Sequence, residues 1–231
     1  MKKNFSNDGF FVTGTGTGVG KTFASACLAH FFVSNNFSTA VTKPFQTGIA
    51  QGDDDISVIK EAVPGLCQLP PELENVYRFK MPASPFLAGR TENSRIDISR
   101  IISTISEIKK TFSPDVLIIE GAGGLYVPVN EDIMMIDLIK MLGMPAILVC
   151  DSALGTINHT LLSIKALKSM QIECAGFIFN RTSENPEVIE KDNLETLKEI
   201  SGIPFIGTIK KNSSMSKISP DIYSFPGLSK K

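Results

Sequence analysis

This sequence has few histidines and cysteines, and neither positive nor negative charge is in clear excess. It has two histidines, His30 and His159, and its 23 basic residues nearly balance its 24 acidic ones, which gives a net charge of −1. Two distant histidines are too few for a zinc site. Without a basic excess no overall field attracts nucleic acid or anionic lipid, so any polyanion must bind at a local site. We therefore expect neither a nucleic-acid partner nor a membrane-surface module.

Long hydrophobic runs and closely spaced cysteines are also missing. No stretch of 18 apolar residues occurs, and no apolar segment follows the basic start at residues 1–4, so neither a membrane span nor a secretory signal is expected. None of the cysteines has Cys-x-x-Cys spacing; they are Cys27, Cys67, Cys150 and Cys174. Reduced thiols fit a cytoplasmic protein.

The sequence does contain a rhythm of short apolar runs and longer segments of helical spacing. With 42% hydrophobic and 20% charged residues it has the composition of an ordinary globular protein, and we expect one domain over residues 1–231. The apolar runs are mostly continuous, as expected of parallel strands that are covered on both faces. They lie at Phe10–Thr13, Ala40–Lys43, Val116–Glu120, Ala146–Cys150, Gly176–Asn180 and Pro204–Ile206.

Helical spacing is clearest at residues 98–112 and 157–170. The alternation predicts a doubly wound α/β fold like that of P-loop NTPases: a mostly parallel sheet with helices on both faces, and ligands at the carboxyl ends of the strands. Residues 64–95 contain five prolines and no clear period, which indicates an irregular but structured excursion from this domain. For the tail, residues 210–231, we expect a loop with room for one short helix.

The strongest chemical signal is Gly-Thr-Gly-Thr-Gly-Val-Gly-Lys-Thr at Gly14–Thr22, between the first strand and an apolar helical segment. Glycines let successive N–H groups point at phosphate oxygens, a lysine neutralises the β- and γ-phosphates, and a hydroxyl binds Mg²⁺. The loop is one residue longer than the usual phosphate-binding loop, because Thr15 stands where the first glycine is expected. A flexible Gly/Thr turn is the alternative, but Gly-Lys-Thr at a strand-to-helix junction is far more specific.

Two acidic segments and one lysine are candidates for the rest of the site. Glu120 ends an apolar strand before three glycines and could hold Mg²⁺, although a polar strand end with a glycine turn explains that segment alone. In the run Asp53–Asp55 one aspartate could bind metal, while the others cap a helix or face solvent. Lys43 ends a strand, either above the phosphate site or as a surface lysine.

Together these segments resemble the dethiobiotin synthetases, the ATP-dependent enzymes of biotin biosynthesis. The resemblance covers residues 9–209 and rests on four motifs, which lie at Phe11–Thr22, Lys43–Gly48 (Lys-Pro-Phe-Gln-Thr-Gly), Glu120–Gly124 (Glu-Gly-Ala-Gly-Gly) and Leu154–His159 (Leu-Gly-Thr-Ile-Asn-His). The longer loop is typical of this family. Partitioning ATPases and cobyrinate amidases share single motifs, but the loop lacks the signature lysine of the former and the chain has no room for the glutaminase domain of the latter.

The resemblance implies a ligase that forms a cyclic urea. In that reaction 7,8-diaminononanoate takes up CO₂, drawn from bicarbonate, as a carbamate; the carbamate oxygen attacks the γ-phosphate of ATP, and the neighbouring amine closes the ring. The products are dethiobiotin, ADP and phosphate. Phosphoryl transfer depends on positioning and charge stabilisation rather than on a side-chain nucleophile, which agrees with the lack of a Ser/His/Asp or Cys/His set.

The resemblance also implies roles for single residues. The implied catalytic residues are Lys43, Lys21 and Thr17. The implied Mg²⁺ ligands are Thr22, Asp55 and Glu120, with Asp54 as the alternative to Asp55. The implied contacts of the nucleotide are Gly18, Val19, Gly20, Lys21, Thr22, Phe23, Asp55, Glu120, Gly121, Ala122, Gly123, Asn180 and Arg181, with Asn180 at the adenine. The implied substrate contacts are Thr17, Lys43, Thr47, Leu154 and Asn158; Asn158 would receive the substrate carboxylate from a second subunit, which implies a homodimer.

The sequence departs from the family pattern at two positions and in the divergent tail beyond Lys210. Gly18 stands where some members have an acidic residue, and Lys210 stands where a proline is common near the adenine pocket, so the choice of nucleotide base is left open. The alternative function is an ATP switch of the same fold, similar to a partitioning ATPase. Lys43 with Thr47 favours the synthetase, because a switch needs no lysine and hydroxyl beside the γ-phosphate.

Overall fold

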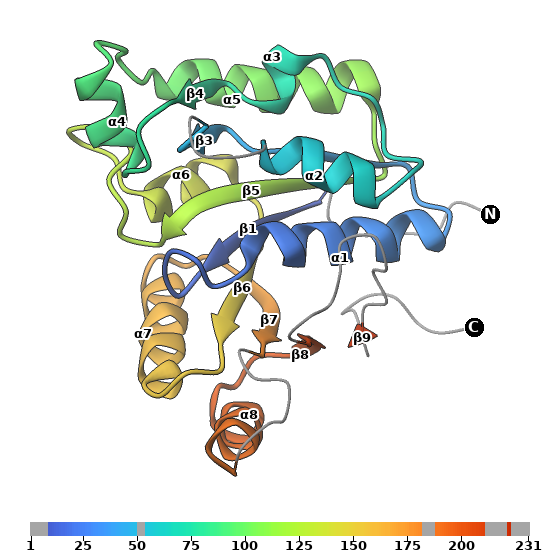
Figure 1. Ribbon diagram of the computed structural model, residues 1–231, viewed down its shortest axis with the longest axis vertical. Helices are drawn as coiled ribbons and strands as arrows, with labels where there is room; N and C mark the ends of the chain where they lie inside the picture. The colour runs from blue at the N-terminus through green and yellow to red at the C-terminus, as the bar shows by residue number, and fades with distance from the viewer. Residues whose placement is uncertain (1–8, 50–53, 182–187, 211–220, 223–231) are drawn as a thin grey trace.

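The central element of the fold is a seven-stranded sheet with the strand order β2-β5-β1-β6-β7-β8-β9 (Figure 1). The computed structural model describes residues 9–49, 54–181, 188–210 and 221–222. Neighbouring strands of this sheet are parallel except β8 and β9, which are antiparallel. The strands are β1 (Gly9–Gly14), β2 (Thr39–Thr42), β5 (Val116–Gly124), β6 (Ala146–Asp151), β7 (Cys174–Asn180), β8 (Phe205–Ile209) and β9 (Asp221–Ile222).

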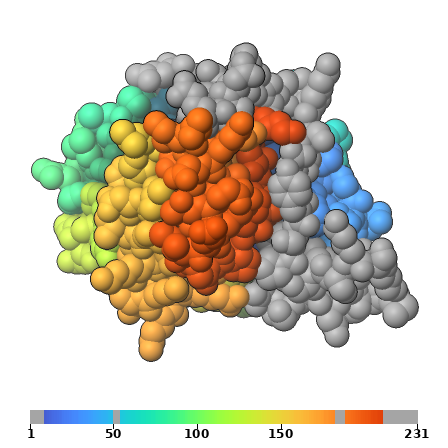
Figure 2. Space-filling view, turned by 90° about the horizontal axis from the view of Figure 1, so that it is seen from below, coloured from blue at the N-terminus to red at the C-terminus, as the bar shows by residue number. Residues whose placement is uncertain are grey.

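Helices cover both faces of the sheet, because successive strand residues point to opposite sides. Val12 and Ile118 face α1 and α2, whereas Phe11 and Ile119 face α5 and α6. Further along the second face, Phe177 packs under α7 and α8, which lie at the surface shown in Figure 2. The helices are α1 (Lys21–Ser34), α2 (Asp55–Ala62), α3 (Pro71–Glu74), α4 (Pro85–Thr91), α5 (Ile98–Glu107), the π-helical turn η1 (Ile108–Phe112), α6 (Met135–Leu142), α7 (Thr156–Ser169) and α8 (Val188–Ile200).

The predicted doubly wound, mostly parallel fold is confirmed, and each predicted strand is present. The largest difference lies at β5, which continues to Gly124 instead of ending at Glu120. It continues because Gly124 still pairs with Gly14 of β1, beyond a shift in the register. The helical spacing of residues 98–112 also corresponds to two elements: α5 ends at Glu107, and the last turn from Ile108 to Phe112 is π-helical.

The proline-containing excursion carries structure that the sequence did not specify. It holds α3, α4 and the short strand β4 (Tyr77–Phe79), which pairs in parallel with β3 (Phe45–Thr47) as a second sheet. Phe45, Tyr77 and Phe79 stack their rings in sequence and anchor this small sheet on the α5 and α6 face of the main sheet. The excursion is therefore attached to the segment that directly follows β2.

In the tail, Asp221 and Ile222 form β9 along β8, where the sequence had indicated only a loop and one short helix. Residues 211–220 and 223–231 of that tail, and Asp53 of the acidic run, lie outside the described residues. None of the described helices has the length and apolar character needed to cross a membrane.

Candidate functional site

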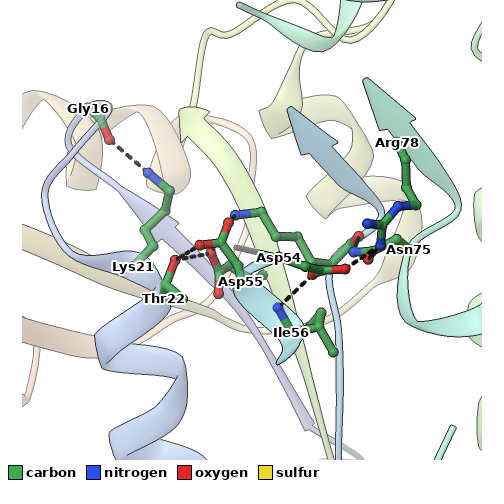
Figure 3. Close-up of polar contacts among 10 residues, drawn as sticks. Gly16, Lys21, Thr22, Asp54, Asp55, Ile56, Asn75 and Arg78 are labelled. Atoms are coloured by element: carbon green, nitrogen blue, oxygen red, sulfur yellow. Dashed lines mark hydrogen bonds and ion pairs between the residues drawn. The ribbon is translucent and has the colours of Figure 1, made fainter. Parts of the chain in front are cut away.

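The phosphate-type loop joins β1 to α1 at the carboxyl edge of the sheet. Gly20 precedes the helix with φ +92°, a left-handed conformation that disfavours a side chain, and a Cβ there would lie 2.2 Å from Nδ2 of Asn180. Lys21 folds back over the loop, and its Nζ donates a hydrogen bond of 2.9 Å to the Gly16 carbonyl (Figure 3). The N-terminus of α1 and the Lys21 ammonium thus share one edge of the loop, which is the arrangement that binds phosphate.

Beside the loop, four side chains from four elements converge. Thr22 lies in the first turn of α1, Lys43 follows β2, Asp55 begins α2 and Glu120 lies inside β5. The Thr22 hydroxyl is 3.0 Å from Asp55 Oδ1 and 2.9 Å from Glu120 Oε1. The Lys43 ammonium donates to Glu120 Oε1 at 2.8 Å and also forms an ion pair with Asp55 Oδ2. We call Thr22, Lys43, Asp55 and Glu120 the lysine–carboxylate cluster.

Strand register explains why Lys43 meets Glu120 although 77 residues separate them. Thr42 pairs with Ile119 on neighbouring parallel strands, so the next residue of each strand lies side by side. On the other side of β5, Glu120 pairs with Val12 of β1, close to the phosphate loop. The order β2-β5-β1 therefore places the Lys43 cation and the Glu120 carboxylate next to the loop.

The two lysines of the site differ in charge balance. Burial lowers the pKa of Lys21 to about 8 against the attraction of Glu120, and the nearby positive charge of Lys43 lowers it further. Burial also opposes the charge on Lys43, but Glu120 and Asp55 outweigh it and raise the pKa of Lys43 above its usual value. Burial likewise opposes ionisation of Asp55, yet the Lys43 charge and hydrogen bonds hold its pKa below the usual value. The cluster is thus an ionised lysine between carboxylates.

The cluster also fits a hard divalent cation. Its oxygen donors are a hydroxyl and two carboxylates, the set that Mg²⁺ uses together with phosphate oxygens. Glu120 is fully buried, and its Oε2 has no hydrogen-bond partner among the described residues. The ammonium of Lys43 already bridges both carboxylates, which demonstrates that this point accommodates positive charge. Nowhere in the described part of the chain do three His, Cys, Asp or Glu side chains gather, so a purely protein-built metal cage is not present there.

Asp54 and Asp55 point in different directions, which the sequence could not show. Asp54 caps α2, since its Oδ1 accepts a hydrogen bond of 2.9 Å from the Ile56 amide. Its other oxygen pairs with Arg78 of β4 (Figure 3). Asp55, one residue on, turns toward Thr22 and Lys43.

The glycines after Glu120 do not form the glycine turn that was the alternative interpretation of this segment. Because β5 continues through them, Gly121 lies against β1, where a Cβ would be 2.6 Å from the Phe11 ring. Gly123 has φ +66° and lies beside Thr17, while Ala122 packs with the core of the α5 face. These residues set the approach of β5 to the start of the phosphate loop.

Of the two expected nucleotide residues at the end of β7, Asn180 contacts the phosphate loop itself. Asn180 Nδ2 donates a hydrogen bond of 2.9 Å to the Val19 carbonyl, so this side chain connects the end of β7 to the loop. Arg181 follows and lies 3.8 Å from a carboxylate oxygen of Glu190. Phe23 packs on the α1 side of the core, and Gly18 is exposed at the loop tip.

Four of the expected substrate residues lie outside the cluster. Thr47 ends β3 and is half-buried. Thr17 is exposed and lines a cavity of about 730 Å³ between the phosphate loop, residues 124–127 and α7. Leu154 and Asn158 are exposed at the start of α7, and no hydrogen bond among the described residues connects either to the cluster.

Sequence reasoning missed two residues beside the cluster. Asn75 is buried, and its Nδ2 donates a hydrogen bond of 2.9 Å to the backbone carbonyl of Lys43. Arg78 donates to Asn75 Oδ1 at 2.9 Å and pairs with Asp54. Both belong to the excursion, whose sequence has no period from which contacts with Lys43 could be inferred.

The chain is similar to known proteins over most of its length. Residues 8–219 match the family model described as an AAA domain. The chain is 38% identical over 211 residues to the ATP-dependent dethiobiotin synthetase BioD of Bacillus subtilis (strain 168), covering 90% of each chain. It is 37% identical over 203 residues to the protein of that name from Methanocaldococcus jannaschii, covering 87% of this chain and 92% of that one.

Among solved structures, the fold is similar to that of proteins with other names. The signal recognition particle receptor FtsY from Elizabethkingia anophelis superposes with a TM-score of 0.61 at 18% identity, over 97% of this chain and 64% of that one. The MinC:MinD cell division protein complex of Aquifex aeolicus gives 0.59 at 16% identity, over 91% of this chain and 85% of that one. At these identities the likeness concerns the fold alone.

Proposed function

Since the chain belongs to the ATP-dependent dethiobiotin synthetase family, we propose that the phosphate loop and the lysine–carboxylate cluster form the active site of that reaction. The protein is an ATP-dependent ligase of biotin biosynthesis. One observation supports the assignment of the site above all others: Lys43 and Glu120 meet at 2.8 Å beside Thr22 and the phosphate loop.

Lys21 and the amides at the start of α1 would bind the β- and γ-phosphates of ATP. Lys43 would contact the carbamate and the γ-phosphate, and its positive charge would stabilise the charge that spreads over the transferring phosphoryl group. In the free protein the Lys43 ammonium is held by Asp55 and Glu120, so it is ionised before the substrates bind. Catalysis then consists of positioning and electrostatic stabilisation, with no nucleophilic side chain.

Thr22, Asp55 and Glu120 would hold Mg²⁺, which supplies positive charge to the phosphate oxygens when it is bound. The proposal rests on the donor chemistry and on the buried, unpartnered Glu120 Oε2 among the described residues. Asp55 is preferred to Asp54, because Asp54 is engaged as the cap of α2 and by Arg78.

Asn180 and Arg181 would lie along the nucleotide, with Asn180 joining the adenine end to the phosphate loop. Support comes from the hydrogen bond between Asn180 and the Val19 carbonyl. Gly18, Val19, Gly20 and Phe23, with the segment Gly121–Gly123, would complete the nucleotide contacts that the family resemblance implies.

We further propose that the protein works as a cytoplasmic homodimer. Leu154 is 86% exposed at the start of α7, and Tyr126 and Leu162 expose large apolar side chains at the cavity that Thr17 lines. A second subunit on this surface would bring its Leu154 and Asn158 toward the diamine, near Thr17 and Thr47. The free thiols among the described cysteines fit a reducing compartment. Because β4 of the excursion pairs with β3 beside the site, we treat residues 1–231 as one domain.

A diamine-dependence assay tests this function. Phosphate release is measured in a mixture of ATP, Mg²⁺ and bicarbonate under three conditions. The first contains 7,8-diaminononanoate, the second contains 8-aminononanoate as the matched monoamine, and the third contains neither amine. The synthetase predicts release with the diamine alone, because the monoamine cannot close the ring. Equal release under all three conditions would favour an ATP switch of the same fold.

A further inference from the structure

A chain of polar contacts connects Lys43 to the start of α2 through the excursion. Figure 3 shows its members Asn75, Arg78 and Asp54. The carbonyl of Lys43 accepts from Asn75 Nδ2 at 2.9 Å, Asn75 Oδ1 accepts from Arg78 Nη1 at 2.9 Å, and the same guanidinium nitrogen pairs with Asp54 Oδ2. Asp54 directly precedes Asp55 in the chain. We call Asn75, Arg78 and Asp54 the excursion relay.

The relay is combined with a backbone clamp on Lys43. The Lys43 amide donates to the Glu74 carbonyl at 2.8 Å, while its own carbonyl accepts from Asn75. Both polar backbone groups of Lys43 are therefore held by consecutive residues of the excursion. On the far side, Asp54 is fixed twice, by the amide of Ile56 and by Arg78.

We propose that Arg78, with Asn75 and Asp54, is a positioning device that fixes the distance between Lys43 and Asp55. This inference deepens the proposed function, because it assigns the excursion the task of aligning the catalytic lysine with the carboxylate that would hold Mg²⁺. Lys43 follows β2 and Asp55 begins α2, and a displacement of about 1 Å between reacting groups can cost about 100-fold in rate. A link outside the cluster that ties both segments together supplies this alignment.

The exposure of the Arg78 side chain indicates that Arg78 positions the site rather than stabilises the fold. Its side chain is 45% exposed, and exposed ion pairs contribute little to folding. A second, comparable ion pair joins α2 to the excursion: Lys60 Nζ lies 2.7 Å from Glu74 Oε1, and the Lys60 side chain is 34% exposed. Among the described residues, Lys60 makes its hydrogen bond to Glu74 and none to Asn75, Asp54 or the cluster. Lys60→Gln is therefore the matched control for Arg78→Gln.

The test measures the affinity of ATP by calorimetry, once with Mg²⁺ and once with a chelator, for the wild type, Arg78→Gln, Asp54→Asn, the double variant and Lys60→Gln. Asparagine still caps α2, so Asp54→Asn removes only the charge that pairs with Arg78. Mg²⁺ should increase the affinity for ATP, and we expect Arg78→Gln and Asp54→Asn each to make this increase about three- to tenfold smaller. The double variant should be no worse than either single variant, because all three remove the same link between Arg78 and Asp54. Lys60→Gln should keep the wild-type gain, with a melting temperature like that of Arg78→Gln.

The inference is overturned if Arg78→Gln retains the wild-type gain from Mg²⁺, if Lys60→Gln loses as much, or if the wild type gains nothing from Mg²⁺. A parallel kinetic measurement should show kcat reduced about tenfold in Arg78→Gln, beyond any effect of Lys60→Gln. The calorimetry contains no diamine, so it reports on the relay whether or not dethiobiotin is made. Failure of the proposed function would appear instead as phosphate release by the wild type that ignores the diamine.

Discussion

The phosphate loop and the lysine–carboxylate cluster lie side by side, yet they are built in opposite ways. The loop is one continuous segment, Gly14–Thr22, whose lysine bonds a carbonyl five residues away. The cluster draws its side chains from α1, the residue after β2, α2 and β5, and its longest contact in sequence, between Thr22 and Glu120, spans 98 residues. The loop uses backbone amides and a lysine of lowered pKa; the cluster uses carboxylates around a lysine of raised pKa.

The difference indicates how the two parts share the work. Lys21 has a lowered pKa and makes no ion pair with a carboxylate among the described residues, so its ammonium is available to bind the nucleotide. A cation that is already bridged by two carboxylates must be positioned by the fold, and the excursion provides that positioning for Lys43. We therefore expect changes in the cluster to affect turnover and the contribution of Mg²⁺, and changes in the loop to affect nucleotide affinity itself.

The largest effect is expected for Lys43→Ala. Loss of this charge should lower kcat by about 10² to 10³, the effect of removing one preorganised stabilising group. Because Glu120 is fully buried and would lose its cation, stability without Mg²⁺ should also fall, by about 3 kcal/mol. Initial rates and thermal melts with and without Mg²⁺ measure both quantities, and Lys60→Ala is the control. A Lys43→Ala protein with normal kcat would break the contrast between the two regions.

Removing one charge from the carboxylates comes next. Glu120→Gln and Asp55→Asn nearly preserve shape, but each should reduce Mg²⁺-dependent turnover about 100-fold, because the cation would lose an anionic ligand. Rates are measured across a Mg²⁺ titration. Glu195→Gln, which changes an exposed carboxylate that pairs with Lys198 on α8, should behave like the wild type. Unchanged Mg²⁺ dependence in both cluster variants would remove the metal from this site.

A smaller effect is expected from pH at the loop. In the free protein Lys21 loses its proton near pH 8, and bound phosphates favour the charged form, so its pKa is higher in the complex. ATP affinity should then be constant below pH 8 and fall as the pH rises through 8, by up to about tenfold per unit. Calorimetry at pH 7, 8 and 9 in two buffers of different ionisation enthalpy also measures the proton uptake. Affinity that does not change over this range, with no proton uptake, would contradict the assignment.

The smallest effect is expected at the contact between β7 and the loop. Asn180→Ala removes the hydrogen bond to the Val19 carbonyl, and the KM for ATP should rise about fivefold, the equivalent of about 1 kcal/mol, with kcat nearly unchanged. Steady-state kinetics at varied ATP provides the measurement. A fall in kcat with constant KM would mean that the loop, too, controls turnover.

How far the sequence could predict these regions follows from how each is built. The phosphate loop and the parallel strands were predictable, because glycine spacing and apolar runs are local signals. The contact of Lys43 with Glu120 required the register of β2 on β5, and the different contacts of Asp54 and Asp55 required the start of α2. Arg78 and Asn75 left no signal, because an exposed arginine and a buried asparagine in an aperiodic segment have many structural explanations.

In the proposed reaction this site joins the carbon of CO₂ to a diamine and consumes ATP. The most direct test incubates the protein with ¹³C-bicarbonate, 7,8-diaminononanoate, Mg²⁺ and ATP, and determines the mass of the product. The account predicts a cyclic urea that carries the heavy carbon, formed by the wild type with one phosphate released per ring and nearly absent with Lys43→Ala. Phosphate release without any labelled cyclic urea, or equal product from both proteins, would contradict it.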